Sequence, residues 1–329
     1  MSSTPPSALS RLKRKVLSAV GSPPAKPETQ AETNAADIKR PTLIAPAKTA
    51  EPQSTPEADP TQTLPPGDLA PGTATTAVLG NSLPKSGTHM LNMTVEHLGV
   101  WANAGLHVNI NGYRINDPSS HGLHACPAAK VVPRLQPGYA FTAHLAYDPN
   151  VDAFMQSDAG NHVRHVFMVR DPRDLIVSWM RYATYSKTFA SHGPFKPIHE
   201  HLRDNFENDG DRLEYAIEER SKFPYRHYTG WMDSPVTRVV QFEALHDGLE
   251  GAGQGELRPG LGGLLEFLRV DPEAMDLQAL HGKVYGQSIT SMRDKFKPSS
   301  FRDSFEERHY KLIDNDHWRH AVTSFGYDW

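Results

Sequence analysis

Hydrophobic residues along the chain form short extended runs, each followed by a polar loop and then by apolar residues at helical spacing. Residues 75–79 are β-branched or apolar, and from Met90 to Leu98 apolar residues recur every three or four positions. The same order returns at 162–169, a strand-like run, and at 175–182, a helical run. This repetition predicts an α/β fold with a central, mainly parallel sheet flanked by helices.

Two further apolar runs predict additional strands. Residues 139–145 alternate between apolar and polar types after a Pro-Gly turn, and 237–242 is typical of a buried strand. The chain is rich in glycine from 248 to 263, which predicts a connecting loop that leads into a helix at 264–269.

A loop that combines glycine, hydroxyl groups and a lysine separates the first strand from its helix. It reads Gly-Asn-Ser-Leu-Pro-Lys-Ser-Gly-Thr-His from Gly80 to His89. A loop of this type points several backbone N–H groups and the positive end of the helix dipole at one place. Because Ser86 and Thr88 add hydroxyl groups and Lys85 adds a positive charge, the segment predicts a site for an anionic phosphate.

The loop is not a Walker A loop, which needs Gly, Lys and Ser or Thr in direct succession, because Lys85 stands two residues before Gly87. It closely resembles the 5′-phosphosulfate loop of sulfotransferases that use 3′-phosphoadenosine 5′-phosphosulfate (PAPS). That loop reads Pro-Lys-Ser-Gly-Thr followed by Thr or His, and Pro84 to His89 match it throughout. The resemblance extends over about residues 76–329 and implies a P-loop-like three-layer fold that binds PAPS as a cosubstrate. It implies donor-site roles for Lys85, Ser86, Gly87, Thr88 and His89.

A second polar loop follows the run 162–169 and reads Arg-Asp-Pro-Arg-Asp from Arg170 to Asp174. Arg170 falls at the C-terminal edge of the predicted strand, where open α/β sheets bind ligands, and a guanidinium can bind a phosphate through two hydrogen bonds. The same family has a matching Val-Arg-Asn/Asp-Pro-Arg/Lys-Asp stretch with Val-Ser one turn later, which here ends at Ser178. The resemblance implies that Arg170 and Ser178 hold the 3′-phosphate of the nucleotide. We expect Arg173 and Asp174 to act as local capping partners.

The run 139–145 places His144 at a strand end. Transfer of a sulfuryl group to an alcohol requires the acceptor O–H to lose its proton as the oxygen attacks sulfur, and a histidine that titrates near neutrality suits this task. The chain has 17 histidines, most of which we expect in solvated or packing roles. The family resemblance puts the catalytic base at the Thr-x-His-Leu position, which is His144.

Three positions depart from the family pattern. Met90 stands where many members have a Trp that stacks on adenine. The stretch from Thr290 to Met292 resembles a Thr-Ser-Phe segment that contacts adenine from the other side, with packing in a helical core as the alternative for Met292. The usual Arg-Lys-Gly segment over the 3′-phosphate is missing, and Arg302 is the candidate for that role, with an exposed helix position as the alternative.

These residues imply one in-line displacement of the sulfuryl group from PAPS to an acceptor hydroxyl, with Lys85 stabilising charge and His144 taking the proton. No metal is expected, since the sequence has no His-Glu-x-x-His or Cys-x-x-Cys motif. Two alternatives stay open: a nucleotide-dependent kinase, which needs an aspartate base and Mg²⁺, and a non-catalytic nucleotide-binding or scaffold protein. The sequence does not identify the acceptor, a small alcohol, lipid or saccharide, whose pocket we expect in variable loops at 101–136 and 182–228.

Composition divides the chain at about residue 74. Residues 1–74 hold 13 of the 27 prolines and have no Phe, Trp or Tyr, so they are predicted to be a disordered tail. Within the tail, 7–20 has a basic amphipathic pattern, which indicates either a transient helix or a helix that contacts a membrane surface or a partner. Residues 75–329 are predicted to form one sulfotransferase domain.

Charge and cysteine content limit the setting of the protein. The net charge of −4 offers no basic footprint for nucleic acid. Cys126 is the only cysteine, which excludes an intrachain disulfide and favours a reducing compartment, and no apolar stretch approaches 18 residues. We therefore expect a cytoplasmic protein without a transmembrane segment.

Overall fold

The computed structural model describes residues 72–115, 124–186, 189–190, 196–286 and 298–329. The predicted helix at 7–20 and nearly all of the predicted tail lie outside these ranges, as do Thr290 and Met292. None of the helices in the described ranges is long and apolar enough to cross a membrane.

Seven strands form one sheet in the order β4-β3-β2-β5-β1-β6-β7. The five strands β2, β5, β1, β6 and β7 run parallel, and β3 and β4 pair antiparallel at one edge. Their bounds are β1 (Ala77–Ser82), β2 (Ala102–Asn109), β3 (Gly112–Ile115), β4 (His124–Ala125), β5 (Tyr139–His144), β6 (Val163–Val169) and β7 (Thr237–Gln241). The predicted α/β architecture with a mainly parallel sheet is confirmed.

The central strand β1 is buried along its whole length, as expected for a parallel strand covered on both faces. Its side chains alternate between two cores: Ala77 and Leu79 belong to one hydrophobic cluster and Val78 to the other. β6 alternates in the same way, with Phe167 in the first cluster and Met168 in the second. Helix layers on both sides of the sheet produce this pattern.

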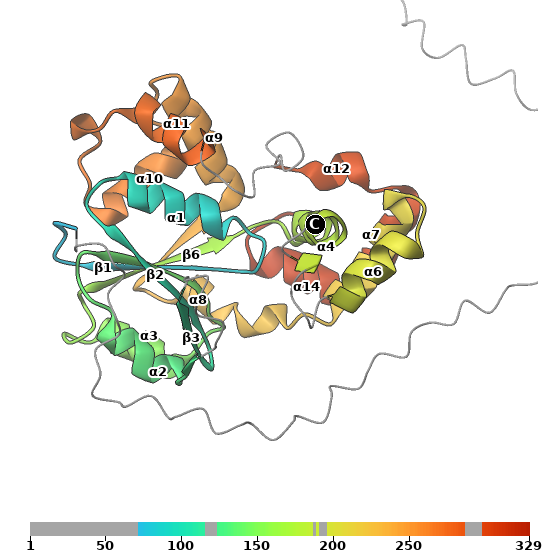
Figure 1. The fold of residues 1–329 in the computed structure, drawn as a ribbon, viewed down its shortest axis with the longest axis horizontal. Helices are drawn as coiled ribbons and strands as arrows, with labels where there is room; N and C mark the ends of the chain where they lie inside the picture. The colour runs from blue at the N-terminus through green and yellow to red at the C-terminus, as the bar shows by residue number, and fades with distance from the viewer. Residues whose placement is uncertain (1–71, 116–123, 187–188, 191–195, 287–297) are drawn as a thin grey trace, which may run out of the picture. The chain divides into compact units, whose positions relative to one another are not determined.

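One face of the sheet is covered by α1 (Thr88–His97), α9 (Phe242–Gly253), α10 (Pro259–Leu268) and α11 (Leu277–Gly286) (Figure 1). The other face packs on α2 (Ala128–Val131), α3 (Pro149–Gln156) and α8 (Gly230–Asp233). The long helix α4 (Pro172–Tyr185) follows β6 and packs against several of the remaining helices. These are α6 (Lys196–Asp204), α7 (Asp209–Ser221), α12 (Ser300–Ser304) and α14 (Asp316–Ser324), and α13 (Glu307–Ile313) packs against α7.

Two expectations from the sequence are wrong. The first concerns the variable loops expected at 101–136 and 182–228. The region 101–136 contains β2, β3 and β4, whose polar residues conceal the alternation of buried Ala104, Leu106 and Val108, and the described part of 182–228 is mainly helical, in the end of α4 and in α6 and α7. The glycine-rich region 248–263 is largely helical, in α9 and α10. Gly248 permits close packing of these helices, because a Cβ there would lie 2.5 Å from the backbone nitrogen of Leu261.

A polar chain is buried beside β6. The Nδ1 atom of His165 lies 2.7 Å from Thr237 Oγ1, Thr237 donates to Ser234, and Ser234 donates to Asp152 over 2.6 Å. Because Thr237 uses its proton on Ser234, His165 donates through Nδ1. Its Nε2 atom is buried with no hydrogen-bond partner among the described residues, and burial lowers the pKa of His165 to about 3.

This burial predicts a pH-dependent stability. His165 binds a proton below about pH 6.5 in the unfolded chain but only near pH 3 in the folded one, so its contribution to stability is lost as pH falls below 6.5. Between pH 6.5 and 4 we expect His165→Asn to flatten the decline in unfolding free energy by up to about 1.4 kcal/mol per pH unit. Denaturant unfolding at several pH values measures this slope, with exposed His320→Asn as the control. Equal slopes in His165→Asn and wild type would contradict the prediction.

Candidate active site

The predicted motifs meet at one edge of the sheet. Because β1, β5, β6 and β7 are parallel and adjacent, their C-terminal ends lie side by side. The loop 83–87 follows β1, His144 ends β5, Arg170 follows β6, and Phe242 follows β7. Residues more than 150 positions apart in the sequence therefore line the same edge.

The loop after β1 has two residues in a left-handed backbone conformation. Lys85 and Gly87 both have positive φ angles, of 77° and 102°. Gly87 precedes α1 without a side-chain cap, and the first turn of α1 carries no acidic residue. Since the first N–H groups of a helix have no intrahelical acceptor, this turn presents donors and the positive end of the helix dipole to an anion.

Ser86 has a structural role in this conformation. Its hydroxyl group lies 2.5 Å from the carbonyl oxygen of Leu83 and 3.1 Å from that of Met168 and shares its one proton with them, and its N–H also donates to Leu83. The side chain is fully buried. Ser86 thus holds the loop against β6, and the outward-facing groups of the loop are its backbone and Lys85.

Two cations from the two motifs converge beside the loop. Burial and the charge of Arg170 lower the pKa of Lys85 to about 8. The Lys85 Nζ atom lies 3.7 Å from the centroid of the Tyr182 ring, and the Arg170 guanidinium lies 4.2 Å from that of Phe242. Repulsion between the two cations is relieved by a bound anion, and groups with such perturbed pKa values are typical of functional sites.

The second motif forms the start of α4. Arg170 is 2% exposed, and its Nη2 atom lies 3.4 Å from the carboxylate of Asp174. Asp171 caps α4 by accepting from the N–H of Arg173, and it also binds the Arg173 guanidinium through both carboxylate oxygens. Arg173 therefore has the local role expected of it. Ser178 lies buried in α4 two turns after Asp171.

His144 is oriented by the backbone of β1. Its Nδ1 atom lies 3.0 Å from the carbonyl oxygen of Ser82, which can only accept a hydrogen bond. We therefore assign the proton to Nδ1 and the lone pair to Nε2, the tautomer required of a base. Asn81 fixes the strand ends by exchanging hydrogen bonds with the backbone of Leu145, over 2.8 and 2.9 Å.

The environment keeps His144 neutral. Burial lowers its pKa to about 4, with smaller contributions from the charges of His89 and Lys85, while the bond to the Ser82 carbonyl opposes the shift. The sequence predicts a histidine that titrates near neutrality, whereas the pKa of about 4 leaves the imidazole unprotonated at physiological pH, with a free lone pair but as a weaker base. The Ser82 hydroxyl lies 3.3 Å from His144 Nδ1 and 2.6 Å from Thr88 Oγ1, so hydrogen bonds link the histidine to the loop.

His107, which lies on β2 against His144, was not predicted as a site residue from the sequence. The two ring centroids are 4.7 Å apart in an edge-to-face arrangement, and His107 Nδ1 shares a hydrogen bond of 2.9 Å with Thr142. Burial and the neighbouring His144 lower the pKa of His107 to about 3. The register of β2 on β5 places His107 opposite Thr142 and Asn109 opposite His144. This register alone brings His107 to the site.

The other predicted donor-site residues differ in their exposure to solvent. His89 is exposed in the first turn of α1, and Met90 is partly buried against the cluster formed with α9, α10 and α11. Arg302 is exposed on α12, where its guanidinium lies 5.4 Å from the Phe301 ring centroid.

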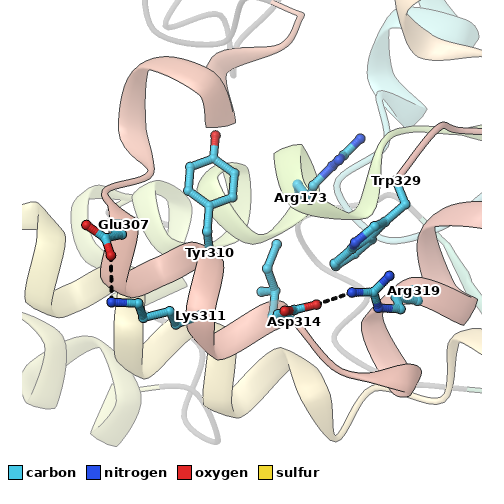
Figure 2. Close-up of a pocket in the computed structure, with 8 residues that line it drawn as sticks. Arg173, Glu307, Tyr310, Lys311, Asp314, Arg319 and Trp329 are labelled. Carbon is cyan, nitrogen blue, oxygen red and sulfur yellow. Dashed lines mark hydrogen bonds and ion pairs between the residues drawn. The ribbon is translucent and has the colours of Figure 1, made fainter. Parts of the chain in front are cut away.

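A separate surface pocket of about 390 Å³ lies where α13 and α14 meet the start of α4 (Figure 2). Figure 2 shows Lys311 turned to Glu307 and Arg319 to Asp314, and both pairs are ion pairs. The lining of this pocket includes Arg173 but none of the predicted donor-site or catalytic residues. The described residues also contain no cluster of three or more His, Cys, Asp or Glu side chains that could hold a metal.

No protein-family model matches the chain, and no curated protein matches it at a significant level. Among solved structures, mouse sulfotransferase SULT7A1 complexed with PAP is similar over 75% of this chain and 88% of that chain, at 15% identity and a TM-score of 0.37. Retinol dehydratase in a complex with retinol and PAP is similar over 79% of this chain and 84% of that chain, at 16% identity and a TM-score of 0.41. A sulfotransferase domain from the curacin biosynthetic pathway is similar over 79% of this chain and 99% of that chain, at 12% identity and a TM-score of 0.32. The function proposed below rests on the residues at the sheet edge rather than on these similarities.

Proposed function

We propose that this chain is a sulfotransferase that moves the sulfuryl group of PAPS to an acceptor hydroxyl. One observation carries the proposal: an uncapped helix start, the cations Lys85 and Arg170, and the neutral imidazole of His144 lie together at the C-terminal edge of four parallel strands. The first three groups suit a donor with two separate anionic groups, and the fourth suits deprotonation of an alcohol.

The donor site divides between the two motifs. Lys85 and the N–H groups at the start of α1 bind the 5′-phosphosulfate, with Thr88 adding a hydroxyl group and Ser86 holding the loop in shape. Arg170 and Ser178 bind the 3′-phosphate. Adenine contacts from Met90, Thr290 and Met292, and closure by Arg302, complete the proposed set.

The chemistry is a single displacement at sulfur. The acceptor oxygen forms a bond to sulfur while the bond from sulfur to the phosphate oxygen breaks, and His144 Nε2 takes the acceptor proton. Lys85 and the loop N–H groups stabilise the negative charge that develops on the bridging and equatorial oxygens. His144 Nδ1 continues to donate to the Ser82 carbonyl, which stabilises the imidazolium as it forms.

Calorimetric titration with adenosine 3′,5′-bisphosphate (PAP), and separately with ADP and Mg²⁺, tests the donor site. We expect wild type to prefer PAP and Arg170→Ala to weaken PAP binding about 100-fold, because two charge-assisted hydrogen bonds are lost. Arg258→Ala is the charge-matched control, since Arg258 forms ion pairs with Asp247 and Glu256 on the surface. Preference for ADP with Mg²⁺ would favour a kinase, and no binding to either would favour a scaffold.

A further inference from the structure

Asp174 connects the second motif to a segment more than 120 residues later in the chain. Its carboxylate accepts hydrogen bonds from the N–H groups of Ser299, over 2.7 Å, and Phe301, over 2.8 Å, and from the hydroxyl group of Ser300, over 3.1 Å. Asp174 is fully buried, and its fourth neighbour is Arg170, at 3.4 Å. One carboxylate therefore holds the start of α12 and contacts the proposed phosphate-binding arginine.

A carboxylate is the group that this position requires. The three partners from 299–301 are donors, and an ionised carboxylate only accepts, whereas an amide would turn an NH₂ group toward at least one of them. A buried carboxylate also needs these bonds, since an unpaired buried charge is costly. The interactions with Asp174 hold Ser299 with a positive φ of 60°, which is uncommon for a residue with a side chain.

Two other side chains of α4 also contact α12. The guanidinium of Arg173 lies 4.4 Å from the centroid of the Phe301 ring, and Arg181 donates to Ser304 over 3.3 Å. α4 also carries Ser178, the second proposed ligand of the 3′-phosphate. The segment 299–304 is thus docked on the helix whose first turns form this part of the proposed donor site.

The distances separate the two tasks of Asp174. Its bonds to Ser299 and Phe301 are short, whereas its contact with Arg170 is long. When Arg170 turns to a phosphate, Asp174 loses only the weakest of its four interactions. We propose that Asp174 is a positioning residue that holds 299–304 beside Arg170 and so closes the donor site on the 3′-phosphate side. This role rests on the proposed function.

Amide hydrogen exchange and PAP titration of Asp174→Asn test this role. We expect faster exchange at Ser299 and Phe301, about tenfold weaker PAP binding, and a raised KM for PAPS with kcat nearly unchanged. In wild type, PAP should slow exchange at these two amides, and in Asp174→Asn it should not. Asp303→Asn, which removes an exposed acid from α12 itself, should behave as wild type.

Ser300→Ala provides a second variant in case Asp174→Asn fails to fold. It removes one of the three bonds from the segment and should shift the same exchange rates and the same affinity in the same direction by less. Wild-type PAP affinity in Asp174→Asn, or faster exchange spread evenly over the chain, would overturn the positioning role. Absence of PAP binding by wild type would instead overturn the proposed function, and the positioning role with it.

Discussion

Replacement of His144 by asparagine should lower kcat by about 10² to 10⁴-fold while the affinity for PAP stays within about twofold. Asparagine can still donate to the Ser82 carbonyl as His144 Nδ1 does, so the strand ends keep their geometry. It has no counterpart of the basic Nε2 atom. The variant therefore removes proton transfer and leaves the loop and Arg170 in place, and steady-state kinetics with PAP titration separates the two effects.

The dependence of wild-type kcat/KM on pH tests the role of His144 independently. Because the pKa of His144 is lowered to about 4, the imidazole stays unprotonated as pH falls through 6.5. The acid limb of kcat/KM should therefore lie near pH 4 rather than 6.5. The exposed His320→Asn is the control and should leave the rate and the profile unchanged. Wild-type turnover by His144→Asn would remove His144 from the mechanism.

The sequence predicted the elements that carry strong local signals. The strand before the loop, the loop and the helix after it are all present, at 77–82, 83–87 and 88–97. This segment could be predicted because a buried parallel strand reads as an apolar run and because few residue types fit a tight loop before a helix. The same holds for β6 and α4 around Arg170.

Residues that depend on strand register could not be predicted. His107 contacts His144 only because β2 pairs with β5, and the shift in register between Asn103 and His107 has no sequence signal. Ser82 and Asn81 look like ordinary residues at a strand end, although one orients His144 and the other ties β1 to β5. These contacts come from tertiary structure, which local propensity does not encode.

Asp174 illustrates a second limit of the sequence. An acid in the first turn of a helix is ordinarily explained by the helix dipole, and the sequence supports that explanation for Asp174. The structure shows both carboxylate oxygens bound to residues 299–301 instead. A local explanation was sufficient, so nothing in the sequence pointed to a partner about 125 positions away.

We expect Gly87→Ala, which adds one methyl group to the loop, to lower the stability of the protein strongly. A Cβ at this position would lie 2.5 Å from Phe242 Cδ2 and 3.0 Å from Met168 Sδ, and the φ of 102° is strained for any residue with a side chain. Backbone strain and overpacking each cost about 1–3 kcal/mol, so we expect unfolding free energy to fall by about 3 kcal/mol and Tm by about 6–12 °C.

The loss should extend from stability to nucleotide binding. The Phe242 ring must move to admit the new methyl group, and the Arg170 guanidinium lies against that ring, 4.2 Å from its centroid. We therefore expect at least about tenfold weaker PAP binding, measured by calorimetry on the folded fraction. The double variant Gly87→Ala, Phe242→Leu removes the clash with the ring but leaves the close contact with Met168 and the strained φ, so it should recover only part of the stability.

Gly282→Ala is the matched control for Gly87→Ala. Gly282 lies exposed within α11, and a Cβ there would meet nothing within 4 Å. Alanine in a helix interior is more favourable than glycine by up to about 1 kcal/mol, so this variant should be as stable as wild type or slightly more so. If Gly87→Ala matched Gly282→Ala in stability and wild type in PAP affinity, Gly87 would not couple the loop to Arg170. The two motifs would then act on the nucleotide independently, and the close contact through Phe242 would be packing alone.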